Sequence, residues 1–367
     1  MVTGMKKIFI AFIFFITASM PVSADTGTAA MPFLKIPGGA RGAAMGGAFS
    51  ATCDDSTAIF FNPAATVFID RSELSLSHAM WLEDMSIENI SYVQPMTSLL
   101  SFTAGASALV SGTMSANDES GSSSGSFSSM DIAAQAGLSY ILTKRVYVGA
   151  QAKIFSQSVD SESVSTVGGD IGIVARGDYF RYAFSVMNFG PKIKLDEHSF
   201  DLPRTIRAGI SREFFKGFRA GAEYIDYIDS GASIALGSEY AISIRQDDLQ
   251  HVFLRAGYAS GRDSNAGSGL SAGIGFQTSD LRVDYAFVPY GDIGNLHRFS
   301  LSLFFGSSRE NMRETYEYHY RSREENRLQT ENKLFKKGKD RIADIPQNAY
   351  FDEYKPKEEK KIRDFTW

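Results

Sequence analysis

The sequence predicts an all-β protein, an antiparallel transmembrane β-barrel of about fourteen strands with an N-terminal plug and a C-terminal charged helical tail. Three observations lead to this prediction: an export signal, a long run of two-residue alternation, and connections that alternate in length. The chain of 367 residues is long enough for one large β domain. Its 33 glycines and 13% aromatic residues suit tightly packed strands with aromatic belts.

The first 24 residues have the order of a signal peptide. Lys6 and Lys7 precede an apolar run at 8–16, and small residues follow up to Ala24. That is a basic segment, a hydrophobic segment and a small-residue cleavage pattern. The apolar run is shorter than the roughly 20 residues that a membrane-spanning helix needs. We therefore predict a signal peptide over 1–24, export by the Sec pathway, and a place in the bacterial outer membrane.

Residues 71–306 alternate with a period of two, which is typical of strands with two different faces. Leu281, Val283 and Tyr285, for example, alternate with Arg282 and Asp284. An apolar face would contact outer-membrane lipid, and a polar face would line the lumen. The predicted strands lie near 73–80, 86–94, 100–111, 130–141, 145–156, 167–176, 180–188, 203–212, 217–226, 232–244, 251–259, 269–277, 280–288 and 297–306.

The connections between these strands alternate in length. Long connections are expected at 112–129, 157–166, 189–202, 260–268 and 289–296, and short ones at 142–144, 177–179, 213–216 and 278–279. Bacterial barrels have short periplasmic turns and longer external loops, so both ends of the barrel sequence are predicted to be periplasmic. The connections at 227–231 and 245–250 break the trend. The Ser/Gly-rich stretch 115–129 is expected to be a mobile external loop.

The polar face predicts a crowded, charged lumen. Arg-Ala-Gly recurs at Arg207, Arg219 and Arg255, and acidic residues occupy other positions of the same face. Small residues beside opposite charges suit an interior in which side chains meet. The side chains expected to face the lumen are Lys153, Arg181, Arg207, Arg219, Glu223, Glu239, Arg255, Arg282 and Asp284.

Residues 25–70 are rich in small side chains and poor in strand pattern. Its small-residue part, 31–70, is at the size below which, at roughly 40 residues, chains rarely bury enough surface to fold alone, so the segment is expected to lie inside the barrel as a plug. Arg41 within it needs an acidic partner if it is buried. The acids that could serve are Asp54, Asp55, Glu223 and Glu239. Holding the plug in place is favoured over direct contact with a substrate, because buried charges are normally paired.

The order of short motifs in this segment is distinctive, and Asn62 before Pro63 favours a turn or an extended link. The motif residues are Arg41, Met45, Gly46, Gly47, Asp54, Asp55, Asn62, Pro63 and Ala64. Together they resemble the N-terminal signature of the PorV/PorQ family, a branch of the FadL-like outer-membrane proteins. The resemblance implies a fourteen-stranded barrel whose N-terminal segment forms a hatch in the lumen. FadL-like relatives carry hydrophobic compounds, whereas PorV-like members serve protein secretion and surface attachment.

Three functions follow from this resemblance. The first is a channel or carrier for a small hydrophobic ligand, gated by the hatch. The second is a non-transporting component of a secretion or surface-attachment system, with protein partners bound through the loops and the tail. The third is a structural barrel with a fixed plug. The loops are modest beside those of true fatty-acid transporters, which argues against a fatty-acid substrate.

Residues 307–367 change to charges of alternating sign. Glu317 and Arg321 have helical i, i+4 spacing, and Gly338 follows a basic run. We predict a periplasmic, partly helical tail with a helix near 309–337. A solvated tail is favoured over a dedicated docking helix, because mixed charge runs are usually solvated.

Several classes of function are excluded by composition. Cys53 is the only cysteine, so no multi-cysteine metal site exists, and none of the 5 histidines has metal-ligand spacing. No serine, histidine and acid form a recognisable catalytic frame. The net charge of −5 gives no basis for binding nucleic acid. We expect no enzymatic activity, no metal and no cofactor.

Overall fold

A computed structural model of the chain describes residues 29–309, apart from 82–84, 113, 118–122, 160–161, 196–197, 245–249 and 263. The predicted signal peptide and the predicted tail helix lie outside the described residues. Among the residues described, no helix is long and apolar enough to cross a membrane.

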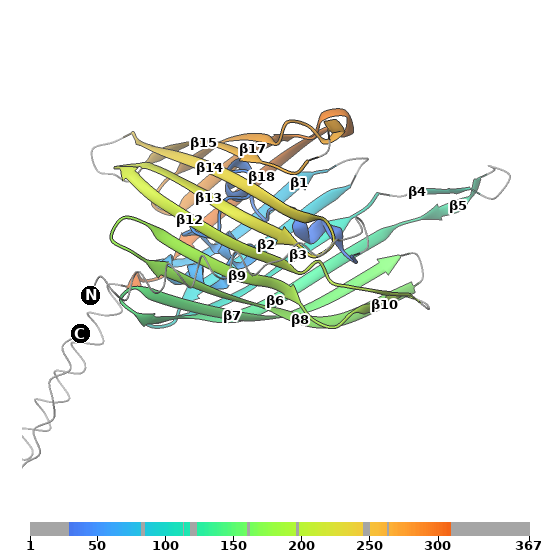
Figure 1. Cartoon of the computed structure of the whole chain (residues 1–367), viewed down its shortest axis with the longest axis horizontal. Helices are drawn as coiled ribbons and strands as arrows, with labels where there is room; N and C mark the ends of the chain where they lie inside the picture. The colour runs from blue at the N-terminus through green and yellow to red at the C-terminus, as the bar shows by residue number, and fades with distance from the viewer. Residues whose placement is uncertain are drawn as a thin grey trace, which may run out of the picture. The chain divides into compact units, whose positions relative to one another are not determined.

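Fourteen strands form a closed barrel in which every neighbouring pair is antiparallel (Figure 1). The wall consists of β1 (Ser72–Met80), β2 (Ser86–Pro95), β3 (Leu100–Val110), β6 (Ser129–Thr143), β7 (Val146–Val159), β8 (Glu162–Arg176), β9 (Arg181–Phe189), β12 (Thr205–Phe215), β13 (Phe218–Tyr227), β14 (Gly231–Ser243), β15 (His251–Ala259), β16 (Leu270–Gln277), β17 (Leu281–Pro289) and β18 (Asn295–Phe305). The first and last strands close the barrel, with Ser72 opposite Phe305. The predicted antiparallel barrel of about fourteen strands is confirmed.

Side chains alternate between the two faces of the wall because successive residues of a strand point to opposite sides. On β18, Leu301 and Leu303 are exposed outward, whereas Ser300 and Ser302 are buried inward. The same division runs round the barrel and leaves a broad apolar outer face that suits lipid rather than water. Large apolar side chains exposed on this face include Leu76, Leu138, Ile154, Ile171, Ile234, Leu236, Leu254, Ile274 and Phe299.

The two ends of the barrel differ. At one end, here called the short-turn end, the connections are 96–99, 144–145, 177–180, 216–217, 244–250 and 278–280, and β1 begins and β18 ends there. At the other, the loop end, the connections are 81–85, 111–128, 160–161, 190–204, 228–230, 260–269 and 290–294. Two connections depart from the length trend: 228–230 is short for the loop end, and 244–250 is long for the short-turn end. Both departures were expected from the sequence.

The loop end also carries the errors of the sequence prediction. The long connection expected at 157–166 is wrong, because β7 continues to Val159 and β8 begins at Glu162. Two hairpins were not predicted, namely β4 (Met114–Asn117) with β5 (Ser123–Phe127), and β10 (Ile193–Leu195) with β11 (His198–Phe200). Figure 1 shows β4 and β5 extending beyond the wall. Strand pairing uses backbone groups, so a Ser/Gly-rich sequence can pair without an apolar pattern.

The segment 29–70, here called the plug, lies inside the barrel (Figure 1, blue). It contains η1 (Pro32–Lys35), α2 (Ala40–Ala44), η2 (Ser56–Phe60) and η3 (Pro63–Phe68), and two further short helices, η4 (Ser264–Ala266) and η5 (Gly291–Ile293), lie in the loops. Ala29 forms a bridge to Asp201 at the loop end, and Arg309 binds the carbonyl oxygen of Ile69 at the short-turn end. The plug therefore passes through the lumen from the loop end to the short-turn end.

Candidate functional site

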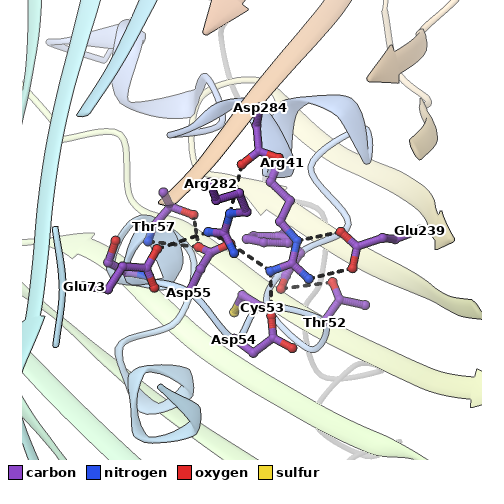
Figure 2. A network of polar contacts seen from close by, with 12 residues as sticks. Arg41, Thr52, Cys53, Asp54, Asp55, Thr57, Glu73, Glu239, Arg282 and Asp284 are labelled. Carbon is purple, nitrogen blue, oxygen red and sulfur yellow. Dashed lines mark hydrogen bonds and ion pairs between the residues drawn. The ribbon is translucent and has the colours of Figure 1, made fainter. Parts of the chain in front are cut away.

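Arg41 of α2 joins the plug to the wall. Its Nε and Nη2 atoms each lie 2.7 Å from one carboxylate oxygen of Glu239 on β14, and its Nη1 lies 2.5 Å from Asp54 and 2.9 Å from Asp55 (Figure 2). The side chain is buried, so these partners take the place of water. A guanidinium that holds a carboxylate through two parallel bonds is both strongly bound and fixed in orientation. Arg41 therefore fastens α2 to the wall.

The same network continues along the wall. The strand register places Glu239 opposite Arg219 on one side and Arg255 on the other. Arg255 lies 2.7 Å from both Glu239 and Asp284, and Arg219 lies 2.6 Å from Asp54. Opposite charges thus alternate across neighbouring strands, which compensates for their removal from water.

The network of ion pairs has a second branch, which includes a residue of the first wall strand, β1. Arg282 of β17 contacts Asp284 at 3.0 Å, Glu73 of β1 at 3.1 Å and Asp55 of the plug at 3.2 Å. Asp55 also caps η2 by accepting a hydrogen bond from the backbone of Thr57 at 3.0 Å. Figure 2 shows these groups meeting Arg41 at one point inside the barrel.

Asp54 remains ionised in this setting. Burial by itself would raise the pKa of its carboxyl group, but the guanidinium groups of Arg41, Arg219 and Arg181 hold that pKa well below its usual range. The carboxylate is therefore a permanent partner of the arginines at neutral pH.

Each of the nine candidate wall side chains has a polar partner in the structure. Six contact the plug, among them Arg181 at the carbonyl oxygen of Cys53, Arg207 at that of Gly47 and Glu223 at the backbone nitrogen of Ser50. The six are Arg181, Arg207, Arg219, Glu223, Glu239 and Arg282. The other three bind wall residues: Lys153 binds Asp170 at 2.7 Å, and Arg255 and Asp284 bind each other.

Of the four acids that were candidates for Arg41, Asp54, Asp55 and Glu239 bind it. The fourth, Glu223, binds Arg207 at 2.7 Å. Glu73 and Asp170 were missed, although both stand at inward positions of alternating strands and the alternation could have found them.

The Asn-Pro-Ala motif fixes the plug near the short-turn end. Asn62 has an extended backbone, and its side chain accepts a hydrogen bond from Ala64 at 3.0 Å, while Pro63 begins η3. The same side chain donates to the carbonyl oxygens of Ile173 at 3.2 Å and Phe184 at 3.3 Å, on β8 and β9. The motif therefore ends one helical turn, starts the next, and binds the wall.

Gly46 and Gly47 both have positive φ angles, of 65° and 84°. A Cβ atom on Gly46 would lie 2.6 Å from the backbone nitrogen of Tyr258, whereas one on Gly47 would meet nothing closer than 3.6 Å. We expect Gly47→Ala to destabilise the plug by about 1 kcal/mol through backbone strain alone. Gly46→Ala adds a clash with the wall and should destabilise it more. Amide hydrogen exchange across the plug would measure both, and equal effects would contradict the close approach at Gly46.

A pocket of about 590 Å³ opens at the loop end. Its floor is the plug and its sides are the inner ends of several strands. Its lining includes Phe33, Ile36, Pro37, Trp81, Leu109, Ile225, Tyr227, Val288, Tyr290 and Leu296, with Lys35, Arg207 and Arg262 as its charged side chains. Lys35 is paired with Asp229 at 2.6 Å, and Arg262 lies over the ring of Tyr290. Its volume and lining suit a small, mostly apolar ligand.

The described residues contain no group of three or more His, Cys, Asp or Glu side chains that could hold a metal ion. The acids of the lumen are instead engaged by arginines. Cys53 is fully buried with Phe49 and Phe61 in an apolar cluster of the plug, so its thiol serves packing.

Solved structures with a similar fold include transporters and channels. The toluene transporter TbuX of Ralstonia pickettii superposes with a TM-score of 0.55 at 12% identity, covering 74% of this chain and 99% of its own. A FadL homologue of Pseudomonas aeruginosa superposes with a TM-score of 0.51 at 14% identity, covering 73% and 98%. The barrel has the FadL-like fold. The CymD monoaromatic hydrocarbon channel shares this FadL-like fold, with a TM-score of 0.52, 14% identity, and coverage of 73% and 97%.

Sequence comparisons add one finding. The model of an uncharacterised protein family, UPF0164, matches residues 16–194, which include the plug and the first wall strands of the FadL-like barrel. No curated protein sequence matches the chain.

Proposed function

We propose that the chain is an outer-membrane carrier for small hydrophobic compounds, which it captures in the loop-end pocket and passes under control of the plug. The observation that carries this proposal is the pocket itself, an apolar cavity of about 590 Å³ floored by the plug in a FadL-like barrel. TbuX and CymD are described as a toluene transporter and a monoaromatic hydrocarbon channel, which supports the same class of cargo here. We propose no catalytic role.

Capture would rest on the hydrophobic effect. Apolar burial contributes about 25 cal/mol per Å², so a small aromatic molecule that loses most of its surface to this pocket would bind weakly and reversibly. Weak binding suits a carrier, because the ligand must also leave. The aromatic rings of Trp81, Tyr227 and Tyr290 offer flat surfaces for such a ligand.

The loop end would face the outside and the short-turn end the periplasm, as in other bacterial barrels. The plug would then act as a hatch. It would block the direct path from the pocket to the short-turn end. Both polar contacts and small apolar clusters join it to the wall. The polar contacts can be exchanged for water when the plug shifts.

The finer family assignment is also a proposal. The order of motifs from Arg41 to Ala64 supports membership of the PorV/PorQ branch, and the outer-membrane setting agrees with it. That branch favours the runner-up function, a non-transporting component of a secretion or surface-attachment system. Its protein partners would bind the loops and the predicted periplasmic tail.

One pair of variants tests the carrier. Ser233 lines the pocket from β14, whereas the next residue, Ile234, points outward and is 55% exposed. Ser233→Trp should fill the pocket and reduce toluene uptake by cells to the rate of cells that lack the protein. Ile234→Trp places the same ring against lipid and should leave uptake unchanged.

Radiolabelled toluene measures the rate, and surface labelling confirms that both variants reach the outer membrane. Equal uptake by the two variants would show that the loop-end pocket is not the entry site. If wild-type uptake were no faster than that of cells without the protein, the carrier function would be rejected. The non-transporting role in secretion or surface attachment would then be the remaining proposal.

A further inference from the structure

Arg298 of β18 is a buried cation without an acidic partner. Its side chain points inward and is fully buried. Its Nη1 atom donates to the carbonyl oxygen of Pro37 at 2.5 Å and to Asn89 Oδ1 at 3.1 Å. Among the described residues, none forms an ion pair with it. Arg255 also has one nitrogen without a hydrogen-bond partner, but its other nitrogens face Glu239 and Asp284, whereas the two partners of Arg298 are both uncharged.

The unused atoms of Arg298 lie on one edge of its guanidinium. Nε and Nη2 are buried and have no hydrogen-bond partner. These two nitrogens form the side of the group that holds both oxygens of a carboxylate in a bidentate pair. Arg41 shows this use in the same lumen, because its Nε and Nη2 hold the two oxygens of Glu239 at 2.7 Å each. In Arg298 the equivalent edge has no hydrogen-bond partner among the described residues.

The neighbouring wall supplies a further donor. Arg298 and Asn89 lie on β18 and β2, with β1 between them, so the guanidinium that reaches Asn89 must cross β1. It crosses beside Ser77, which the register places opposite Asn89, and over Ala79, which lies opposite Arg298 and is small. The hydroxyl of Ser77 is also buried and without a partner. The two unsatisfied nitrogens of Arg298 and the hydroxyl of Ser77 therefore belong to neighbouring positions of the wall.

A buried charge that is left unpaired is strongly unfavourable, and a water molecule would satisfy hydrogen bonds without neutralising it. A bound anion would do both. We propose that Arg298, with Ser77, binds the carboxylate of a small molecule between the plug and strands β18, β1 and β2. Pro37, whose carbonyl orients Arg298, also lines the loop-end pocket, so the site lies next to that pocket. The proposal does not depend on transport.

The carboxylate could belong to a small solute or form the end of a molecule whose apolar part occupies the pocket. Acetate and benzoate distinguish these sources, since only benzoate has an apolar ring. Purified protein in uncharged detergent would be titrated with each salt, and with sodium chloride at the same ionic strength. Two quantities would be followed, the unfolding temperature and the side-chain Nε resonances of ¹⁵N-arginine-labelled protein.

We expect both carboxylates to raise the unfolding temperature more than chloride does, because a ligand that binds only the folded state stabilises it. One Nε resonance, absent from the spectrum of Arg298→Gln, should shift on titration. A stronger effect of benzoate would assign the apolar end to the pocket, and an equal effect would assign the site to small carboxylates alone. Arg298→Gln should unfold at a higher temperature than wild type without carboxylate, and should not respond to it.

Arg204→Gln is the matched control, because Arg204 is an exposed arginine of the loop-end connection 190–204 and is not part of the pocket lining. It should retain the carboxylate response. Arg298→Lys keeps the charge but loses the two-donor edge, so its response should be weaker even if Arg298→Gln fails to fold. Equal effects of chloride and carboxylate would overturn the proposal, as would loss of the response in Arg204→Gln or a wild-type protein whose Nε resonances do not move.

Discussion

Replacing Arg41 by alanine is expected to release the plug from the barrel wall. The substitution removes one cation from contact with Asp54, Asp55 and Glu239, three carboxylates of the lumen. Removing one partner of a buried ion pair destabilises a protein by about 3–5 kcal/mol, because the remaining charge stays buried and unpaired. The wall has its own hydrogen-bonded ladder, so the loss should appear as local unfolding of the plug rather than collapse of the barrel.

Amide hydrogen exchange would show this directly, with faster exchange over residues 38–64 and unchanged exchange in the wall strands. Conductance across planar bilayers should rise, because the plug would no longer fill the lumen. Arg41→Lys should give a smaller effect, since lysine keeps the charge and loses the two-point grip on Glu239.

Lys192→Ala is the control for charge removal. Lys192 pairs with Asp201 at 2.9 Å, but both side chains are at least half exposed. Exposed pairs contribute about 0–1 kcal/mol, so this variant should behave as wild type. If Arg41→Ala exchanged no faster than Lys192→Ala, the network around Arg41 would not be what holds the plug.

The strands could be predicted to within a few residues because their pattern has a local cause. Each wall residue faces either lipid or the lumen, and these two environments select different side chains at alternate positions. The connection wrongly predicted at 157–166 has an explanation of the same kind. Ser156 and Ser158 of β7 bond to Ser165 and Ser163 of β8, so this part of the sheet is polar where lipid does not select for apolar residues.

The charged residues of the candidate site could be predicted from the sequence, but which acid binds which arginine could not. Alternation places both Glu223 and Glu239 on the inner face, so each could have met Arg41. The choice depends on where α2 lies in the lumen, which is set by contacts between segments far apart in the sequence. Arg298 illustrates the same limit, because an unused guanidinium edge becomes apparent only when every neighbouring group is in place.

A disulfide between plug and wall should stop transport if the plug is a hatch. The hydroxyl oxygens of Ser56 on η2 and Ser91 on β2 lie 2.9 Å apart, so cysteines at these two positions would bring their sulfur atoms close to bonding distance. We expect the oxidised Ser56→Cys/Ser91→Cys variant, built with Cys53→Ala to leave no third thiol, to lose toluene uptake. Dithiothreitol should restore it.

The matched control carries a disulfide within the wall. Ser158 and Ser163 are paired across β7 and β8 with their oxygens 3.1 Å apart, and neither belongs to the plug. Ser158→Cys/Ser163→Cys in the same Cys53→Ala background should transport equally well whether oxidised or reduced. A fixed plug gives a different result: the oxidised Ser56→Cys/Ser91→Cys variant would then match this control. In that case any cargo must pass around a plug that does not move, and the polar contacts of Arg41 would be structural alone.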